Sequence, residues 1–230
     1  MKALRLIFCF LRSNRKESFL YMNRFFAAPL VLALLLGFIA LLAMSLGSVS
    51  VPAGEVAAIV TAKLMGAVPA ADPAITDIIW ELRVPRVLLA MTAGAGLALA
   101  GVVMQASVQN SLAEPFILGI ASGAAVGATL SILFGSAAIG LGVPGCAFLG
   151  AIGATAAVLL LAGIGRRVST VKLVLAGAAI SALCTAATNF IVYMAADADG
   201  MQSAAFWTMG SLADAKWHSL FLPVLIVTAL

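Results

Sequence analysis

Five long apolar runs constrain the fold of this chain more than any other feature. They cover about residues 25–47, 87–108, 116–135, 144–164 and 173–195. Each approaches the roughly 20 residues that a helix needs to cross a ~30 Å hydrocarbon core. A sixth run begins near Trp217 and reaches the last residue, Leu230, but at ~1.5 Å per residue it covers only about 21 Å. We therefore expect an all-α, polytopic membrane bundle with five complete spans and an incomplete sixth, cut from a longer protein.

The composition agrees with a membrane protein. Hydrophobic residues make up 63% of the chain and charged residues 10%, and the mean hydropathy is +1.16, which leaves too little polar surface for a soluble globule. The net charge of +4 does not indicate nucleic acid, because six of the thirteen Lys and Arg residues lie within residues 1–24 and the others lie near span ends. The three cysteines are odd in number and two lie inside apolar runs, so no disulfide framework is expected.

The placement of Lys and Arg predicts the orientation of the chain. With a cytoplasmic N-terminus, nine of these residues face the cytoplasm and four face outward, which fits the positive-inside rule. Residues 1–24 then form a basic cytoplasmic segment, 25–230 the transmembrane domain, and 48–86 an external segment within it. The first apolar run is too long for a signal peptide. A short surface helix is predicted in the external segment by apolar residues at helical spacing, namely Val56, Ile59, Val60 and Leu64.

Small residues recur every fourth position in two successive runs. The third run contains Gly119, Gly123 and Gly127, and the second run contains Ala90, Gly94 and Ala98. Small side chains at this spacing let two helix backbones approach closely. The pattern predicts tight helix packing, but it favours no particular function.

The apolar runs carry few candidate functional groups. The five complete runs contain no Asp, Glu, Lys, Arg or His, although proton-coupled carriers and ion pumps usually place an ionisable group at this depth. The single histidine, His218, lies beside Trp217 at a span end, and neither a metal-ligand cluster nor a nucleophile with a base partner is recognisable. The sequence therefore gives no support for an enzyme, a metal site or a bound cofactor.

A polar stripe in the fifth run is the main exception. It follows one face of a helix at i, i+4, i+7 and i+8, and its members are Ser181, Thr185, Thr188 and Asn189. Two interpretations are open at this point. The stripe forms hydrogen bonds between helices or to its own helix backbone, or it lines a pathway with neutral polar groups.

The short segment between the second and third runs has a distinct composition. With a cytoplasmic N-terminus, residues 109–115 form a tight cytoplasmic turn. Pro115 suits the first turn of the third helix, and Glu114 would lie favourably near the positive end of that helix. This structural role does not explain Asn110 and Leu112.

Residues 80–128, WELRVPRVLLAMTAGAGLALAGVVMQASVQNSLAEPFILGIASGAAVGA, resemble the permease subunits of ABC importers of the FecCD type, which take up iron chelates (siderophores or haem) and cobalamin. Two later stretches, RRVSTVKLVLAGAAISAL and FWTMGSLADAKW, resemble the start of that family's fifth helix and the segment before its sixth. The resemblance extends from about residue 30 to the end. Ser111 departs from it, because the family usually has proline at that place in the turn.

The resemblance implies an assembly in the bacterial inner membrane. It implies a homodimer of ten-helix permease subunits, each bound to a cytoplasmic ABC ATPase, which receive substrate from a periplasmic or lipid-anchored binding protein. The helix that contacts the ATPase would lie beyond Leu230. A second class of function stays open, namely a channel or secondary carrier built on another bundle rich in small residues.

The resemblance also implies roles for particular residues. Arg83 and Arg86 at the outer end of the second helix would bind acidic residues of the binding protein, although two arginines at the membrane interface are the alternative. Asn110 and Leu112, together with Thr170 and Val171, would form a cytoplasmic gate near the dimer axis. The rival interpretation is that these four residues only build a crowded turn.

Overall fold

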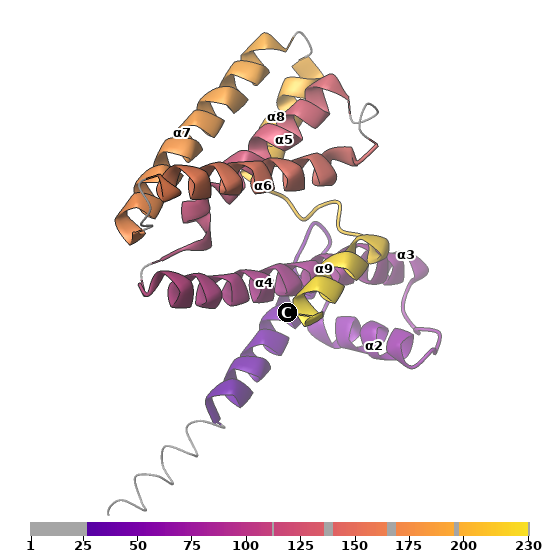
Figure 1. Cartoon of the computed structure of the whole chain (residues 1–230). Helices are drawn as coiled ribbons and strands as arrows, with labels where there is room; N and C mark the ends of the chain where they lie inside the picture. The colour runs from indigo at the N-terminus through magenta and orange to yellow at the C-terminus, as the bar shows by residue number, and fades with distance from the viewer. Residues whose placement is uncertain (1–26, 112, 136–139, 165–168, 196–197, 230) are drawn as a thin grey trace, which may run out of the picture. The chain divides into compact units, whose positions relative to one another are not determined.

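The computed structural model describes residues 27–111, 113–135, 140–164, 169–195 and 198–229. Within these ranges every regular element is a helix and no strand occurs. The predicted all-α fold is therefore confirmed (Figure 1). The basic segment of residues 1–24 lies outside the described residues.

Four helices in the described part of the chain are long and apolar enough to cross a membrane. They correspond to the predicted first, second, fourth and fifth spans, and they are Ala27–Ser45, Pro73–Val108, α6 (Gly142–Gly163) and α7 (Thr170–Met194). The second is continuous but composite, because α3 (Pro73–Asp77) leads through the π-helical η1 (Ile78–Arg83) into α4 (Val84–Val108). In each of the first two, the most apolar stretch of 18 residues is uncovered by the described part of the chain, so the apolar side chains of that stretch are available to lipid or to other protein.

The predicted third span is shorter than expected. A 3-10 helix, η2 (Pro115–Leu118), precedes α5 (Ile120–Phe134), which has 15 residues and covers about 22 Å. Gly119 separates the two with a left-handed φ of 70°, and Gly135 follows α5 with a φ of 84°. The count of five complete spans is therefore wrong, and so is the expectation that Pro115 opens the third α-helix. Pro115 opens η2 instead, and the glycine sets the start of α5.

Two further helices follow α7. The predicted sixth run begins at Trp217 as expected and forms α9 (Trp217–Ala229), which contains Pro223. Before it lies α8 (Ala198–Met209), which the apolar pattern did not predict because this helix has a mixed polar and apolar sequence.

The chain divides into two compact units. The first comprises the described residues up to Leu88 together with Ala215–Leu220. Its core forms where α2 (Ala53–Leu64), η1 and the start of α4 meet, and it consists of Val51, Val56, Ile59, Ile79 and Val84. The helix predicted within residues 48–86 is thus present, with Val56 and Ile59 buried and Leu64 exposed.

A tryptophan pair closes this first unit. The ring centroids of Trp80 and Trp217 lie 4.9 Å apart, and the indole Nε1 of Trp217 donates a hydrogen bond of 3.0 Å to the Trp80 carbonyl. In the π-helical turn Val84 N–H bonds the carbonyl of Ile79, five residues earlier, and the same pattern would pair residue 85 with Trp80. Pro85 has no N–H to donate, so the indole of Trp217 donates to the Trp80 carbonyl in its place.

The second unit comprises Leu89–Asp214 and Phe221–Leu230. In Figure 1, α5 packs among α6, α7 and α8. The glycines of α5 are the reason for the close approach to α6, because a Cβ added at Gly123 would lie 2.5 Å from the Gly150 carbonyl oxygen and one at Gly127 would lie 2.8 Å from the Cys146 carbonyl carbon. The predicted tight packing at the Gly123 and Gly127 positions is confirmed.

The small-residue pattern of α4 has a different environment. A Cβ added at Gly94 would meet nothing within 4 Å among the described residues, and Ala90 and Ala98 are exposed. This face is therefore not packed against the described part of the chain, and the packing predicted there stays a prediction.

Candidate functional site

The turn after α4 begins with a left-handed residue. Gln109 has a φ of 55° and is the only non-glycine residue with a positive φ in the described ranges. The amide of Asn110 then donates back to the Gln105 carbonyl over 3.2 Å, which is the bond that closes a Schellman helix end. Ala113 N–H bonds the Asn110 carbonyl over 3.1 Å. The chain therefore reverses sharply here, with glutamine in a position that usually favours glycine.

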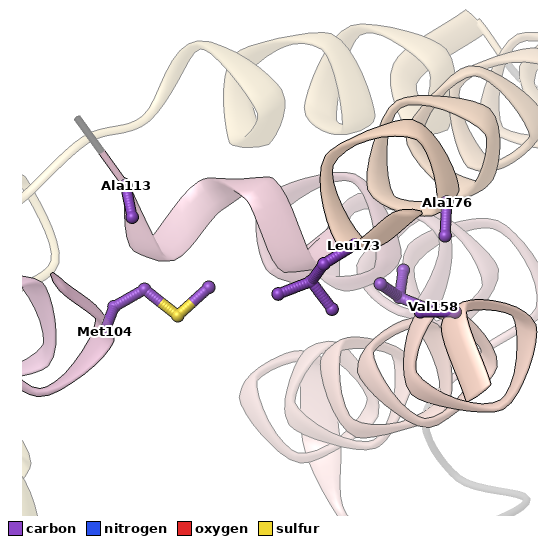
Figure 2. Packing of buried hydrophobic residues seen from close by; sticks show 6 residues of the cluster. Met104, Ala113, Val158, Leu173 and Ala176 are labelled. Carbon is purple, nitrogen blue, oxygen red and sulfur yellow. The ribbon is translucent and has the colours of Figure 1, made fainter. Parts of the chain in front are cut away.

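An apolar cluster supports this turn within the second unit. It joins Met104 at the end of α4, Ala113 of the turn, and residues of α6 and α7, of which Val158 is fully buried. Figure 2 shows Met104 and Leu173 pointing toward each other beneath Ala113. Burial of these side chains holds the end of α4, the turn and the start of α7 at the same end of the unit.

The start of α7 also bonds the end of α4 directly. Ser169 caps α7 by accepting a bond of 3.3 Å from the Lys172 amide, as serine commonly does at this position. The Thr170 hydroxyl donates to the Val108 carbonyl over 3.3 Å, whereas Val171 is 67% exposed. Asn110, Thr170 and Val171 thus belong to one region of the fold, and Leu112 lies outside the described residues.

The turn leads into η2, which packs closely on α7. A Cβ added at Gly177 would lie 2.9 Å from the Ile117 carbonyl carbon, and a Cβ added at Gly119 would lie 3.5 Å from the Ser181 hydroxyl. Glu114 precedes η2 in an extended conformation and makes no side-chain capping bond there, so its charge lies before a 3-10 helix and not directly before α5. The close contact at Gly177 was not predicted, because this residue lies outside the two small-residue repeats recognised in the sequence.

The polar stripe of α7 lies partly on its packed face. Thr188 is buried and Ser181 half-buried, whereas Thr185 and Asn189 are exposed within this chain. The hydroxyls of Thr185 and Thr188 donate to carbonyls one turn earlier, over 2.8 and 3.0 Å. These bonds satisfy the two threonine hydroxyls within α7, and they leave the role of the exposed face open.

The two arginines at the start of α4 differ in environment. Arg83 is buried, with 8% of its surface exposed, and donates to the carbonyls of Met44, Ser45 and Val49. Arg86 is exposed. The prediction gave the two arginines the same role. The sequence contains no signal for the Arg83 bonds, because Arg83 and its acceptors lie 34 to 39 residues apart.

Among the described residues, no group of three or more His, Cys, Asp and Glu side chains is arranged to hold a metal ion.

Comparison with known proteins gives consistent matches. The FecCD transport family matches residues 33–230. The chain is 34% identical over 202 residues to the molybdate import system permease protein MolB of Haemophilus influenzae, with 86% of this chain and 59% of that protein aligned. It is 37% identical over 153 residues to the vitamin B12 import system permease protein BtuC of Klebsiella pneumoniae, with 66% and 45% aligned.

A solved structure has the same fold. It is described as an inward-facing conformation of a metal-chelate type ABC transporter, and it superposes with a TM-score of 0.67 at 33% identity over 86% of this chain and 58% of that one. The chain therefore spans about half the length of the proteins that it matches, between 45% and 59%.

Proposed function

The chain belongs to the FecCD transport family, and on that premise we propose that it is part of the permease subunit of an ABC importer in the bacterial inner membrane. The complete subunit forms a homodimer and binds cytoplasmic ABC ATPases. It accepts substrate from a periplasmic or lipid-anchored binding protein. The permease itself is a transport subunit, and ATP hydrolysis belongs to its partner.

One observation carries this proposal. The family match covers residues 33–230. These residues include the α4 to α5 turn and the start of α7, and the Thr170 hydroxyl and the apolar cluster join these two segments. Family membership favours the permease over a channel or secondary carrier, because neither alternative uses an ATPase and a binding protein.

The substrate is a small chelate or oxyanion. The names of similar proteins include vitamin B12, molybdate and metal chelates, and the sequence resemblance adds ferric siderophores and haem. The exposed part of the α7 stripe, Thr185 and Asn189, carries neutral polar groups, which suit a substrate that passes through without being held tightly.

We assign the pathway to the exposed side of this stripe. Cysteines at Thr185 and Asn189 should react with a water-soluble thiol reagent in the complete permease. Cysteine at Thr188, whose side chain is buried, should be protected. Equal protection at all three positions would return the stripe to helix packing alone.

The gate consists of Asn110, Leu112, Thr170 and Val171, on the cytoplasmic side of a subunit whose N-terminus is also cytoplasmic. Two observations support this assignment. The bond from Thr170 to Val108 joins the start of α7 to the end of α4. The exposed side chain of Val171 is available to contact the other subunit. The binding protein docks at the opposite side, near Arg83 and Arg86.

The assembly can be tested directly. The complete permease, coexpressed with the ATPase of its gene cluster, should copurify with that ATPase as a complex with two copies of each subunit. Addition of the binding protein from the same cluster should raise the rate of ATP hydrolysis. A complete permease that never associates with an ABC ATPase would refute the proposal.

A further inference from the structure

The helix α2 and the turn after it expose an uncharged surface between the first two spanning helices. We call it the α2 patch, and its members are Ala58, Thr61, Leu64, Met65 and Val68. We propose that the α2 patch lies within the membrane, at the boundary between lipid headgroups and acyl chains, in the leaflet where the helix Ala27–Ser45 ends. This inference goes beyond the proposed function and requires only that the chain spans a membrane.

The composition of α2 is unusual for a helix that faces water. A surface helix normally carries charged side chains on the face opposite the core. In α2 the core face holds Val56 and Ile59, but the exposed face holds Ala58, Thr61 and Leu64. The Thr61 hydroxyl donates to carbonyls four and three residues earlier, over 2.8 and 3.1 Å, so it is satisfied without water. A helix that is apolar on both faces indicates an apolar neighbour on each.

The turn after α2 extends the uncharged surface. Leu64 is 74% exposed, Met65 83% and Val68 93%, and such exposure of apolar area to water is unfavourable. The turn also closes its own backbone, because the Ala67 amide donates to the Ala62 carbonyl over 2.8 Å, the bond that ends many helices. A helix end with its main-chain groups paired is suited to contact lipid.

The depth of α2 follows from the core of the first unit. Leu41 and Met44 pack against the apolar cluster that contains the buried side of α2, and both belong to the last turns of the helix Ala27–Ser45. The helix α2 is therefore level with the end of a spanning helix. Trp80 and Trp217 pack against the same cluster, and tryptophan is enriched where a membrane meets water.

The charge next to the patch also fits a lipid surface. Within residues 53–68, which the structure describes in full, the charged residues are Glu55 and Lys63, and both are half-buried. Lys63 directly precedes Leu64, and a lysine stem can follow apolar surface while its ammonium group reaches the lipid phosphates. A protein partner gains little by covering apolar side chains at this depth, because lipid covers them equally well. Lipid is therefore the occupant that we assign to the patch.

Fluorescence quenching in vesicles tests the proposal. The complete permease, with its native cysteines replaced by serine, receives Val68→Cys or Met65→Cys and an environment-sensitive fluorophore at that thiol. Ala74→Cys is the matched control, because Ala74 is exposed in the same unit and its amide bonds the Asp72 carboxylate over 2.8 Å. The vesicles contain phosphatidylethanolamine and phosphatidylglycerol, and some of the lipid carries a nitroxide quencher at the headgroup, in the upper acyl chain or at its middle. Iodide in the water is the second quencher.

We expect the labels at positions 65 and 68 to lose most fluorescence to the nitroxide in the upper acyl chain, because an interfacial helix buries its apolar face by about 5–10 Å. These labels should lose little to iodide, and the label at position 74 should show the opposite ranking. Quenching by iodide as strong as in the control would mean that the patch faces water. If neither quencher reaches the two labels, protein covers the patch. Either result overturns the proposal.

The outcome does not depend on transport. A complete permease that shows the expected quenching but never associates with an ABC ATPase would refute the proposed function and leave the α2 patch in the membrane. A permease that associates with the ATPase while iodide quenches both labels would do the reverse.

Discussion

Replacing Gly123 with alanine should separate α5 from α6. The added Cβ would lie 2.5 Å from the Gly150 carbonyl oxygen, whereas ordinary contacts begin at 3.4 Å, so the two backbones must move apart by about 0.9 Å. Neither side can yield by a rotamer change, because the clashing atoms are the Gly150 carbonyl and the Cβ of Ala154, which would lie even nearer and has no rotamers. A gap of this size forfeits a quarter to a half of the dispersion energy of each contact that it opens.

The expected free-energy change combines two terms. Overpacking costs about 1–3 kcal/mol, and replacing a helical glycine by alanine returns about 0.5–1 kcal/mol. Gly153→Ala in α6 is the matched control, since a Cβ there meets nothing within 4 Å in the described ranges of the chain. The difference in unfolding free energy between the two variants should therefore be about 1–3 kcal/mol, with Gly123→Ala the less stable.

Denaturation of the purified complete permease in mixed micelles, followed by circular dichroism, measures this difference. The double variant Gly123→Ala/Gly150→Ala adds a second check. Each single change forces the same separation, so the double variant should lose less than the sum of the two. If Gly123→Ala is as stable as Gly153→Ala, the close approach of α5 and α6 is refuted.

The remaining predictions concern single hydrogen bonds and the gate. Trp217→Phe leaves the Trp80 carbonyl without its indole donor and should cost about 1–3 kcal/mol of unfolding free energy. The exposed Trp207→Phe variant is the control. An equal loss in both variants would contradict the inference that Trp217 replaces the donor missing at Pro85. The Thr129 hydroxyl is buried and has no hydrogen-bond partner among the residues that the structure describes. Thr129→Val should therefore leave the unfolding free energy unchanged or raise it, and a clear loss would mean that the hydroxyl has a partner. Cysteines at position 112 of both subunits should crosslink in the resting complex with a yield that changes when the ATPase binds nucleotide; a yield indifferent to nucleotide would remove the gate assignment.

The features predicted from the sequence depend on local patterns. Long apolar runs predicted the four helices that are long enough to span a membrane. The repeat of Gly123 and Gly127 predicted the contact between α5 and α6. Both patterns involve residues that are close together in the sequence. The helix of residues 53–64 was visible from the spacing of Val56 and Ile59 for the same reason.

The features that were missed depend on geometry between distant residues or on backbone conformation. The left-handed φ of Gly119 shortens the third span, and no hydropathy pattern reports a single φ angle. The π-helical turn before α4 and the acceptors of Arg83 are also invisible in sequence, since main-chain carbonyls look the same at every residue. The sequence alone did not bring the predicted gate residues together. That prediction used the expected membrane topology together with the resemblance to the permease family.

Uptake by the reconstituted importer tests whether this permease transports a substrate at the expense of ATP. The complete permease and its ATPase are placed in vesicles, with the binding protein on the external side, and accumulation is measured for cobalamin, a ferric siderophore, haem and molybdate. We expect one substrate class to accumulate only when ATP is inside and the binding protein is outside, and accumulation to stop when the ATPase is inactivated. Accumulation driven by an ion gradient, without ATPase or binding protein, would contradict this expectation.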